Sequence, residues 1–98
     1  MRNDIEALFE TRDEAVRKQD RPLFLSTQIS EIEFGSSEGY LSFEDMTTDV
    51  LYIHDESELE KVVLARETYK HAGTNPRSSF LIYFLTSTIK GWRIYRVR

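Results

Sequence analysis

Residues 80–86 read FLIYFLT, an almost continuous apolar run. Alternate side chains of a strand point to opposite faces, which here gives Phe80, Ile82 and Phe84 on one face and Leu81, Tyr83 and Leu85 on the other. The segments 62–69 and 92–97 partly repeat this two-sided pattern, and turn residues separate them from the run at 73–76 and 90–91. Consecutive strands joined by short turns predict an antiparallel meander.

The chain before residue 62 extends this sheet. Residues 50–54 are rich in strand formers and end at the polar turn 55–58, while residues 29–34 alternate apolar with acidic side chains as a half-buried strand does. Residues 35–39 (GSSEG) predict a turn. Residues 40–46 leave two interpretations open, the second strand of a hairpin or a helical turn. We therefore expect a sheet of four to six strands.

The N-terminal segment 4–18 predicts an amphipathic helix. Its apolar side chains recur at helical spacing, with Arg12 completing a stripe of Ile5, Leu8, Phe9, Ala15 and Val16. Asn3 is a favourable N-cap, with Glu6 at the capping-box position, and Asp20 is expected to cap a short second helix that contains Pro22. Helices followed by a run of strands predict an α+β fold with both helices packed on the sheet.

Composition limits the classes of function. The 98 residues indicate one domain, 1–98, with no cysteine for disulfides, thiolate chemistry or cysteine-bound zinc. No apolar run approaches the ~18 residues that cross a bilayer, and no signal peptide is evident, so we expect a cytoplasmic protein without membrane contact. The pI near 5.2 argues against nucleic acid as a partner. This holds despite a basic and aromatic C-terminal segment of Lys90, Trp92, Arg93, Tyr95, Arg96 and Arg98.

Charge is unevenly distributed along the chain. Residues 22–60 hold ten acidic side chains and no Lys or Arg, whereas residues 61–98 hold eight basic side chains and a single acid, Glu67. The simplest interpretation is that opposite charges face each other on neighbouring strands of one sheet.

Candidate chemistry is sparse. His54 beside Asp55 is the most suggestive pair for a general base, but adjacent strand residues point to opposite faces, so a solvated histidine is the better interpretation. Two histidines without a spacing motif do not indicate a metal site, and no cofactor motif is present. We expect any ligand site to be a shallow cavity between helix and sheet, lined by residues among Tyr52, His54, Arg66, Tyr69 and Trp92. The competing interpretation is that Trp92 and one tyrosine are core residues.

The two-sided apolar pattern predicts an interface. The helices can cover only one face of the sheet, and monomers rarely expose large contiguous apolar patches. Two-fold homodimers are the commonest soluble assembly. We therefore expect a homodimer packed through the sheet face away from the helix, with its interface formed by Leu81, Tyr83, Leu85, Tyr95 and Val97.

The order of elements resembles the nuclear-transport-factor-2-like (NTF2-like), or SnoaL-like, superfamily, whose fold is called cystatin-like. Residues 5–16 are similar to its first helix, Asp20 with residues 23–25 to its second, and residues 91–97 to its last strand. Only residues 35–48 stand where the family has a third helix, which makes the chain a shortened member. The resemblance implies a curved sheet wrapped around the helix and frequent dimerisation.

Functions in this superfamily range from isomerases and hydrolases to binding modules, and no catalytic residue of the family can be matched here, so the catalytic residues are unknown. We expect a dimeric, non-enzymatic module that binds a protein partner or a small apolar ligand. The alternative is a SnoaL-like isomerase, lyase or hydrolase with His54 or a pocket carboxylate as its base.

Overall fold

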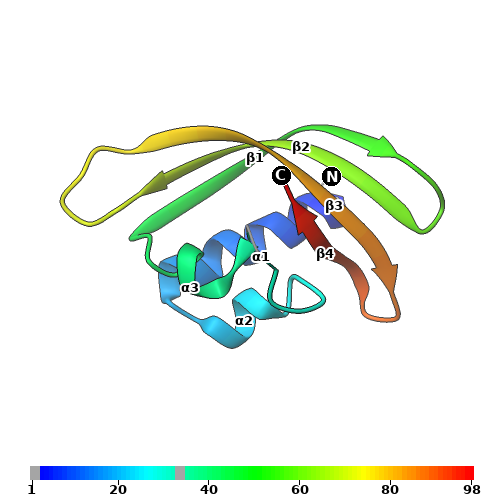
Figure 1. The fold of residues 1–98 in the computed structure, drawn as a ribbon, viewed down its shortest axis with the longest axis horizontal. Coiled ribbons are helices and arrows are strands. Elements are labelled where there is room, and N and C mark those ends of the chain that lie inside the picture. Colours follow the sequence, from blue (N-terminus) through cyan, green and yellow to red (C-terminus); the bar gives the residue numbers. More distant parts are fainter. Residues whose placement is uncertain (1–2, 33–34) are drawn as a thin grey trace.

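A computed structural model describes residues 3–32 and 35–98. In this part of the chain four strands, β1 (Asp45–Asp55), β2 (Glu60–Lys70), β3 (Arg77–Thr88) and β4 (Gly91–Val97), form one antiparallel sheet in sequence order. The sheet is curved, and α1 (Asp4–Lys18), α2 (Arg21–Leu25) and α3 (Ser37–Tyr40) all lie on its concave side (Figure 1). The predicted α+β fold and meander are confirmed, and the convex face has no helical cover among the described residues.

The two predicted helices begin at the predicted caps. Asn3 Oδ1 accepts the Glu6 N–H at 2.8 Å, and Asp20 Oδ1 accepts the Leu23 N–H at 3.0 Å. Gln19 ends α1 in the left-handed conformation, with φ of 56°. None of the described helices is long and apolar enough to span a bilayer.

The core has two parts, both between the helices and the concave face. The first half of α1 packs on β2, β3 and β4 through Ile5, Leu8, Phe9, Val63, Ala65, Tyr83, Leu85, Ile94 and Val97. The second half packs with α2, α3 and the start of β1 through Ala15, Val16, Phe24, Tyr40 and Met46. Burial of these side chains is what holds α1 inside the curve of the sheet.

A bulge explains the two-sided apolar pattern of β4. The β3–β4 pairing moves from Phe84 opposite Arg96 to Leu85 opposite Ile94, which leaves Tyr95 as an extra residue. A bulge reverses the alternation of faces, so Val97 returns to the buried face that Ile94 occupies. The β1–β2 pairing has a similar shift at residues 50–52.

The connection before β1 differs from the sequence prediction. The expected strand 29–34 does not form over residues 29–32. The preceding residue, Gln28, makes an isolated bridge to Ile94, and the Ile29 N–H donates to the Ile94 carbonyl at 3.0 Å. Glu33 and Phe34 lie outside the described residues. The predicted turn at 35–39 contains most of α3, and neither interpretation of residues 40–46 holds throughout, because Tyr40 ends α3 and β1 begins at residue 45. Ser36 caps this single helical turn, which explains how a glycine-containing segment forms a helix.

Candidate functional site

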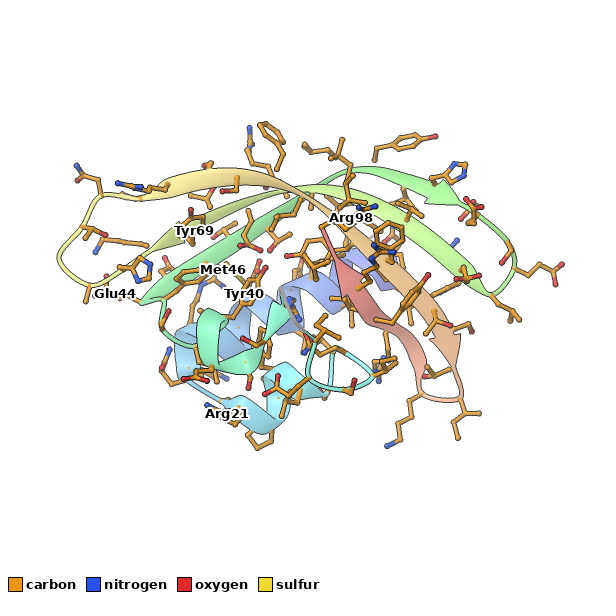
Figure 2. The ribbon with its side chains drawn as sticks, in the orientation of Figure 1. Arg21, Tyr40, Glu44, Met46, Tyr69 and Arg98 are labelled. Atoms are coloured by element: carbon orange, nitrogen blue, oxygen red, sulfur yellow. The ribbon has the colours of Figure 1, made fainter. Side chains whose placement is uncertain are left out.

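A cleft of about 450 Å³ lies between α3 and the β2–β3 ribbon, and we call it the Glu67 cleft. Its walls are mainly aromatic and apolar, formed by Tyr40, Phe43, Tyr69, His71 and Leu81. The other described lining residues are Ser36, Gly39, Ser79 and Glu67, and Glu67 is the one acid among them. Figure 2 labels Tyr40 of α3 and Tyr69 of β2 on the side of the molecule where α3 meets the sheet.

Glu67 is a carboxylate on the buried face of a strand. It follows Val63 and Ala65 on the helix side of β2 and is only 3% exposed. Its Oε2 accepts hydrogen bonds from the Tyr83 hydroxyl at 2.6 Å and the Tyr40 hydroxyl at 2.9 Å. Its Oε1 receives no hydrogen bond from the part of the chain that the structure describes. With respect to the described residues, the carboxylate therefore has one satisfied oxygen and one open acceptor.

Glu67, Tyr40 and Tyr83 form a hydrogen-bonded group that we call the Glu67 cluster. Burial changes the pKa of all three. Desolvation raises the pKa of Glu67 above its usual range, and the hydrogen bonds from Tyr83 and Tyr40 and the charge of Arg12 offset only part of that rise. Burial raises the pKa of Tyr40 to about 12 and that of Tyr83 still further. Both tyrosines are therefore protonated donors at neutral pH.

Arg12 lies behind the cluster and is completely buried. Its guanidinium carbon is 4.2 Å from the ring centroid of Phe24 and 4.7 Å from that of Tyr40. Its Nη1 donates to Thr27 Oγ1 at 3.1 Å and to Gln28 Oε1 at 2.7 Å. Its Nε and Nη2 have no partner among the described residues. The buried cation is thus held mainly by aromatic faces and by the loop after α2.

The aromatic walls are ordered by contacts with one another. The rings of Phe43 and Tyr69 stack with centroids 4.7 Å apart, and His71 lies across Phe43 at 5.0 Å. The Tyr69 hydroxyl lies 3.4 Å from the hydroxyl oxygen of Ser79 on the neighbouring strand. These contacts give the cleft a flat apolar wall close to a buried acceptor.

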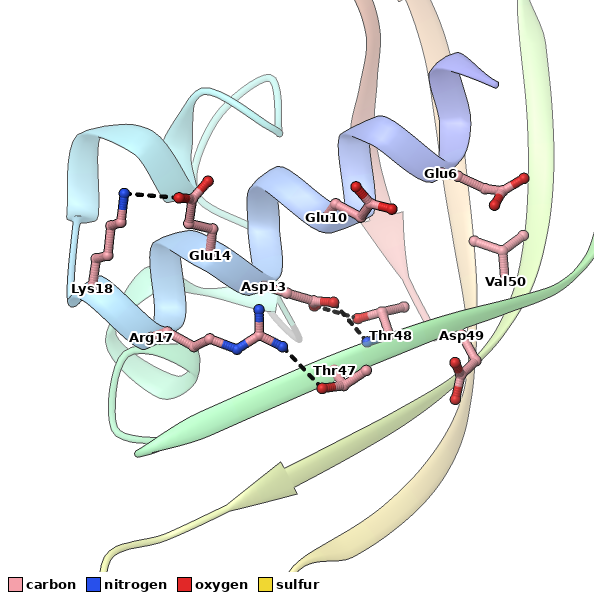
Figure 3. Close-up of a pocket in the computed structure, with 10 residues that line it drawn as sticks. All are labelled: Glu6, Glu10, Asp13, Glu14, Arg17, Lys18, Thr47, Thr48, Asp49 and Val50. Carbon is pink, nitrogen blue, oxygen red and sulfur yellow. Dashed lines mark hydrogen bonds and ion pairs between the residues drawn. The ribbon is translucent and has the colours of Figure 1, made fainter. Parts of the chain in front are cut away.

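A second, larger groove of about 760 Å³ lies between α1 and β1 (Figure 3). Asp13 is 4% exposed there, and both of its oxygens are bound to Thr48 at 2.7 Å. Arg17 binds Asp45 and the Thr47 hydroxyl, and further charged side chains, including Glu14 paired with Lys18, line the groove. Asp13 and Arg17 are bonded to residues of β1, so the side chains of this groove attach α1 to the sheet. Among residues 3–32 and 35–98, no group of three His, Asp or Glu side chains is arranged to hold a metal.

The predicted ligand residues do not share a cavity, so that prediction was wrong. Tyr52 and Arg66 lie on the convex face, Arg66 in an ion pair with Asp49, and His54 is an exposed side chain 3.1 Å from Glu56. Trp92 packs against the core on the helix side of the sheet, as its competing interpretation had it. Its ring faces the Lys61 ammonium, with Nζ 5.0 Å from the centroid.

The predicted interface residues were assigned to the wrong face. Tyr83, Leu85 and Val97 are buried against α1, and Leu81 packs beside them. The physical reason is register, because Tyr83 lies opposite Val63, whose face of β2 carries the side chains on which the helix packs. Tyr95 alone of the five lies on the convex side, where its ring contacts Phe84. The uncovered face instead displays Tyr52, Leu64, Phe80 and Ile82.

The Glu67 cluster was not identified as a site, although the sequence contains a signal for it. Glu67 is the only acid in residues 61–98, and it lies in step with Val63 and Ala65 on one face of a predicted strand. Arg12 likewise stands on the apolar stripe of its helix. A charge on a buried stripe requires a partner, so the two together indicate a buried polar cluster. Tyr40 lies in residues 40–46, for which the sequence allows either a strand or a helical turn.

Several solved structures share this architecture. An NTF-2-like protein of unknown function from Shewanella oneidensis MR-1 aligns with a TM-score of 0.76 and 12% identity over 96% of this chain and 93% of its own. A ketosteroid isomerase-like protein from Erwinia carotovora atroseptica SCRI1043 aligns with a TM-score of 0.67 and 18% identity, over 98% of this chain and 95% of its own. A domain of unknown function with a cystatin-like fold from Nostoc punctiforme PCC 73102 aligns with a TM-score of 0.71 and 14% identity, over 95% of this chain and 72% of its own.

Comparisons of sequence, by contrast, identify no relative. No protein-family model matches the sequence, and no curated protein matches it either. Helices on the concave side of a curved four-stranded meander, together with these alignments, establish that the chain has the NTF2-like, cystatin-like fold.

Proposed function

We propose that the chain binds a small organic molecule in the Glu67 cleft. The observation that carries this proposal is the open Oε1 of a buried carboxylate beside an aromatic wall. Binding sites for small molecules are typically concave and mostly apolar, with a few polar groups that fix orientation. A donor on the ligand would satisfy Oε1, while its apolar body would lie against Phe43 and Tyr69.

The geometry supports binding more than catalysis. The hydroxyls of Tyr40 and Tyr83 both donate to Glu67, so neither of these two is directed at a position where charge would develop on a substrate oxygen. One observation favours the alternative of an isomerase-type proton transfer, namely the raised pKa of Glu67, since a poised carboxyl is a suitable general base. One structural neighbour is itself described as ketosteroid isomerase-like.

We also propose that the protein acts as a homodimer through its convex face. Phe80 is 67% and Tyr52 61% exposed there, and Leu64 and Ile82 are each more than one third exposed. Burial of such a patch against its symmetry mate would remove it from water. The residues of β2 and β3 that line the cleft lie on the helix side of the sheet, so a dimer through the convex face leaves them outside the interface.

Two serines of β3 supply a matched test of ligand binding. Ser79 lines the cleft, whereas Ser78 pairs with Thr68 on the convex face. The amide spectrum of the full chain is recorded by NMR while phenol, indole, benzamide or benzamidine is added at millimolar concentration. At least one probe is expected to shift the signals of Gly39, Phe43 and His71, with the effect lost in Ser79→Phe and retained in Ser78→Phe. Shifts that survive Ser79→Phe, or no shifts at these residues, would contradict the proposal.

Catalysis is tested separately through exchange of a carbon-bound hydrogen. Glu67 acting as a base would take a proton from the α-carbon of a ketone and return a deuteron from heavy water. Protein-dependent deuteration of 1-indanone that is lost in Glu67→Gln would favour the isomerase alternative. If 1-indanone is deuterated no faster with the protein than in buffer alone, the isomerase alternative is contradicted and binding remains the proposed function.

A further inference from the structure

We infer that the Glu67 cleft selects an organic cation, an ammonium or amidinium group carried on an apolar body; this inference rests on the proposed function. Among residues 3–32 and 35–98, those that line the cleft include one carboxylate and no lysine or arginine. An anionic ligand would therefore meet like charge at Glu67 without a compensating cation on the cleft wall. A cationic donor would instead form a charge-assisted hydrogen bond with Oε1, and such bonds are roughly twice as strong as neutral ones.

The aromatic walls suit a cation as well as an apolar body. The faces of tyrosine and phenylalanine rings attract cations electrostatically, and this attraction increases where water is excluded. The chain already uses this pairing close to the cleft, because the Arg12 guanidinium lies over the ring of Tyr40. Tyr40, Phe43 and Tyr69 thus place three aromatic rings around a buried carboxylate.

Arg12 does not reverse this preference. Its guanidinium is completely buried and is not part of the cleft wall, and it lies 4.7 Å from the centroid of the Tyr40 ring. A ligand cation hydrogen-bonded to Oε1 would contact the carboxylate directly, whereas Arg12 donates its hydrogen bonds to Thr27 and Gln28, and Coulomb energy falls with distance. Arg12 also favours the ionised form of Glu67, which is the form that a cation needs.

Three isosteric probes test charge directly: benzamidine, benzamide and benzoate share one shape and differ in charge. NMR titration of the full chain at pH 7.5 and low ionic strength is expected to give benzamidine at least tenfold higher affinity than benzamide at the cleft signals, with benzoate weaker than both. Addition of salt is expected to weaken benzamidine and leave benzamide unchanged. Equal or tighter binding of benzamide or benzoate would overturn the charge preference and leave small-molecule binding intact. Absence of any shift at the cleft would overturn both.

A conservative variant separates the carboxylate from the fold. Glu67→Gln keeps the size of the side chain and an oxygen that can accept from Tyr83, but removes the charge. Benzamidine affinity is expected to fall at least tenfold in Glu67→Gln, while benzamide affinity stays within about twofold. An equal loss for both probes would show that the substitution disturbs the cleft generally, and the charge preference would then be decided by the three probes on the unaltered chain.

Discussion

Asp13 binds Thr48 through both carboxylate oxygens, Oδ2 accepting the backbone N–H and Oδ1 the hydroxyl, each at 2.7 Å. This pair joins α1 to β1 (Figure 3). It also has an electrostatic cost, because burial raises the pKa of Asp13 to about 6 despite the two hydrogen bonds and the charge of Arg17.

Asp13→Asn is expected to change how stability depends on pH. Between the unfolded pKa of 3.8 and the folded value of about 6, the folded chain binds more protons at Asp13 than the unfolded chain does. Stability from this group is therefore highest below pH 4 and is lost as pH rises to about 6, by at most about 3 kcal/mol. Urea unfolding at pH 4.5 and pH 7.5 should show that the stability of the variant relative to wild type improves as pH rises. A constant difference would contradict the raised pKa.

Much of the architecture followed from local patterns, because helix spacing, caps and turn residues act over a few positions. The caps at Asn3 and Asp20 and the four C-terminal segments of strand formers are such features. Which face of β3 meets the helix is a long-range property, since it depends on register with β2 and on a bulge at Tyr95 that no local motif marks. The site also depends on a long-range property, because Tyr40 contacts Glu67 only when α3 is packed against β2.

The two tyrosines are expected to control the acidity of Glu67 unequally. The Tyr83 hydroxyl is the closer donor, at 2.6 Å against 2.9 Å for Tyr40, and its hydrogen bond opposes the rise in the Glu67 pKa more strongly. Tyr83→Phe should therefore raise that pKa further than Tyr40→Phe does. Carbon-detected NMR of the Glu67 carboxyl across pH 4 to 9 measures both values. The reverse order, or no change in either variant, would contradict this assignment of donors.

Arg12→Met is expected to destabilise the chain more at pH 7.5 than at pH 5. Methionine fills the space among the aromatic rings and removes the two unpartnered nitrogens, but it leaves Glu67 without its buried counter-charge. The Glu67 pKa then rises further, so stability is lost as pH increases through the interval between its unfolded and folded values. In the double variant Arg12→Met/Glu67→Gln this additional pH dependence should disappear. Its persistence would show that another group responds to Arg12.

The convex face gives a direct test of assembly. Phe80 lies there opposite Arg66 on β2 and is 67% exposed. Phe80→Asp introduces a charge that a two-fold interface would have to bury in both copies, which costs several kcal/mol. Sedimentation is expected to give a dimer for the 11.6 kDa chain and a monomer for Phe80→Asp.

Ile89 supplies the control for this experiment. It is fully exposed in the turn between β3 and β4, at the edge of the sheet. Ile89→Asp removes the same kind of apolar surface and adds the same charge, but outside the convex face, so the dimer should persist. A monomeric wild-type chain at high concentration would contradict the dimer. Dissociation by Ile89→Asp alone would move the interface from the convex face to the β3–β4 turn, because only a contact at the turn would then bury the new charge.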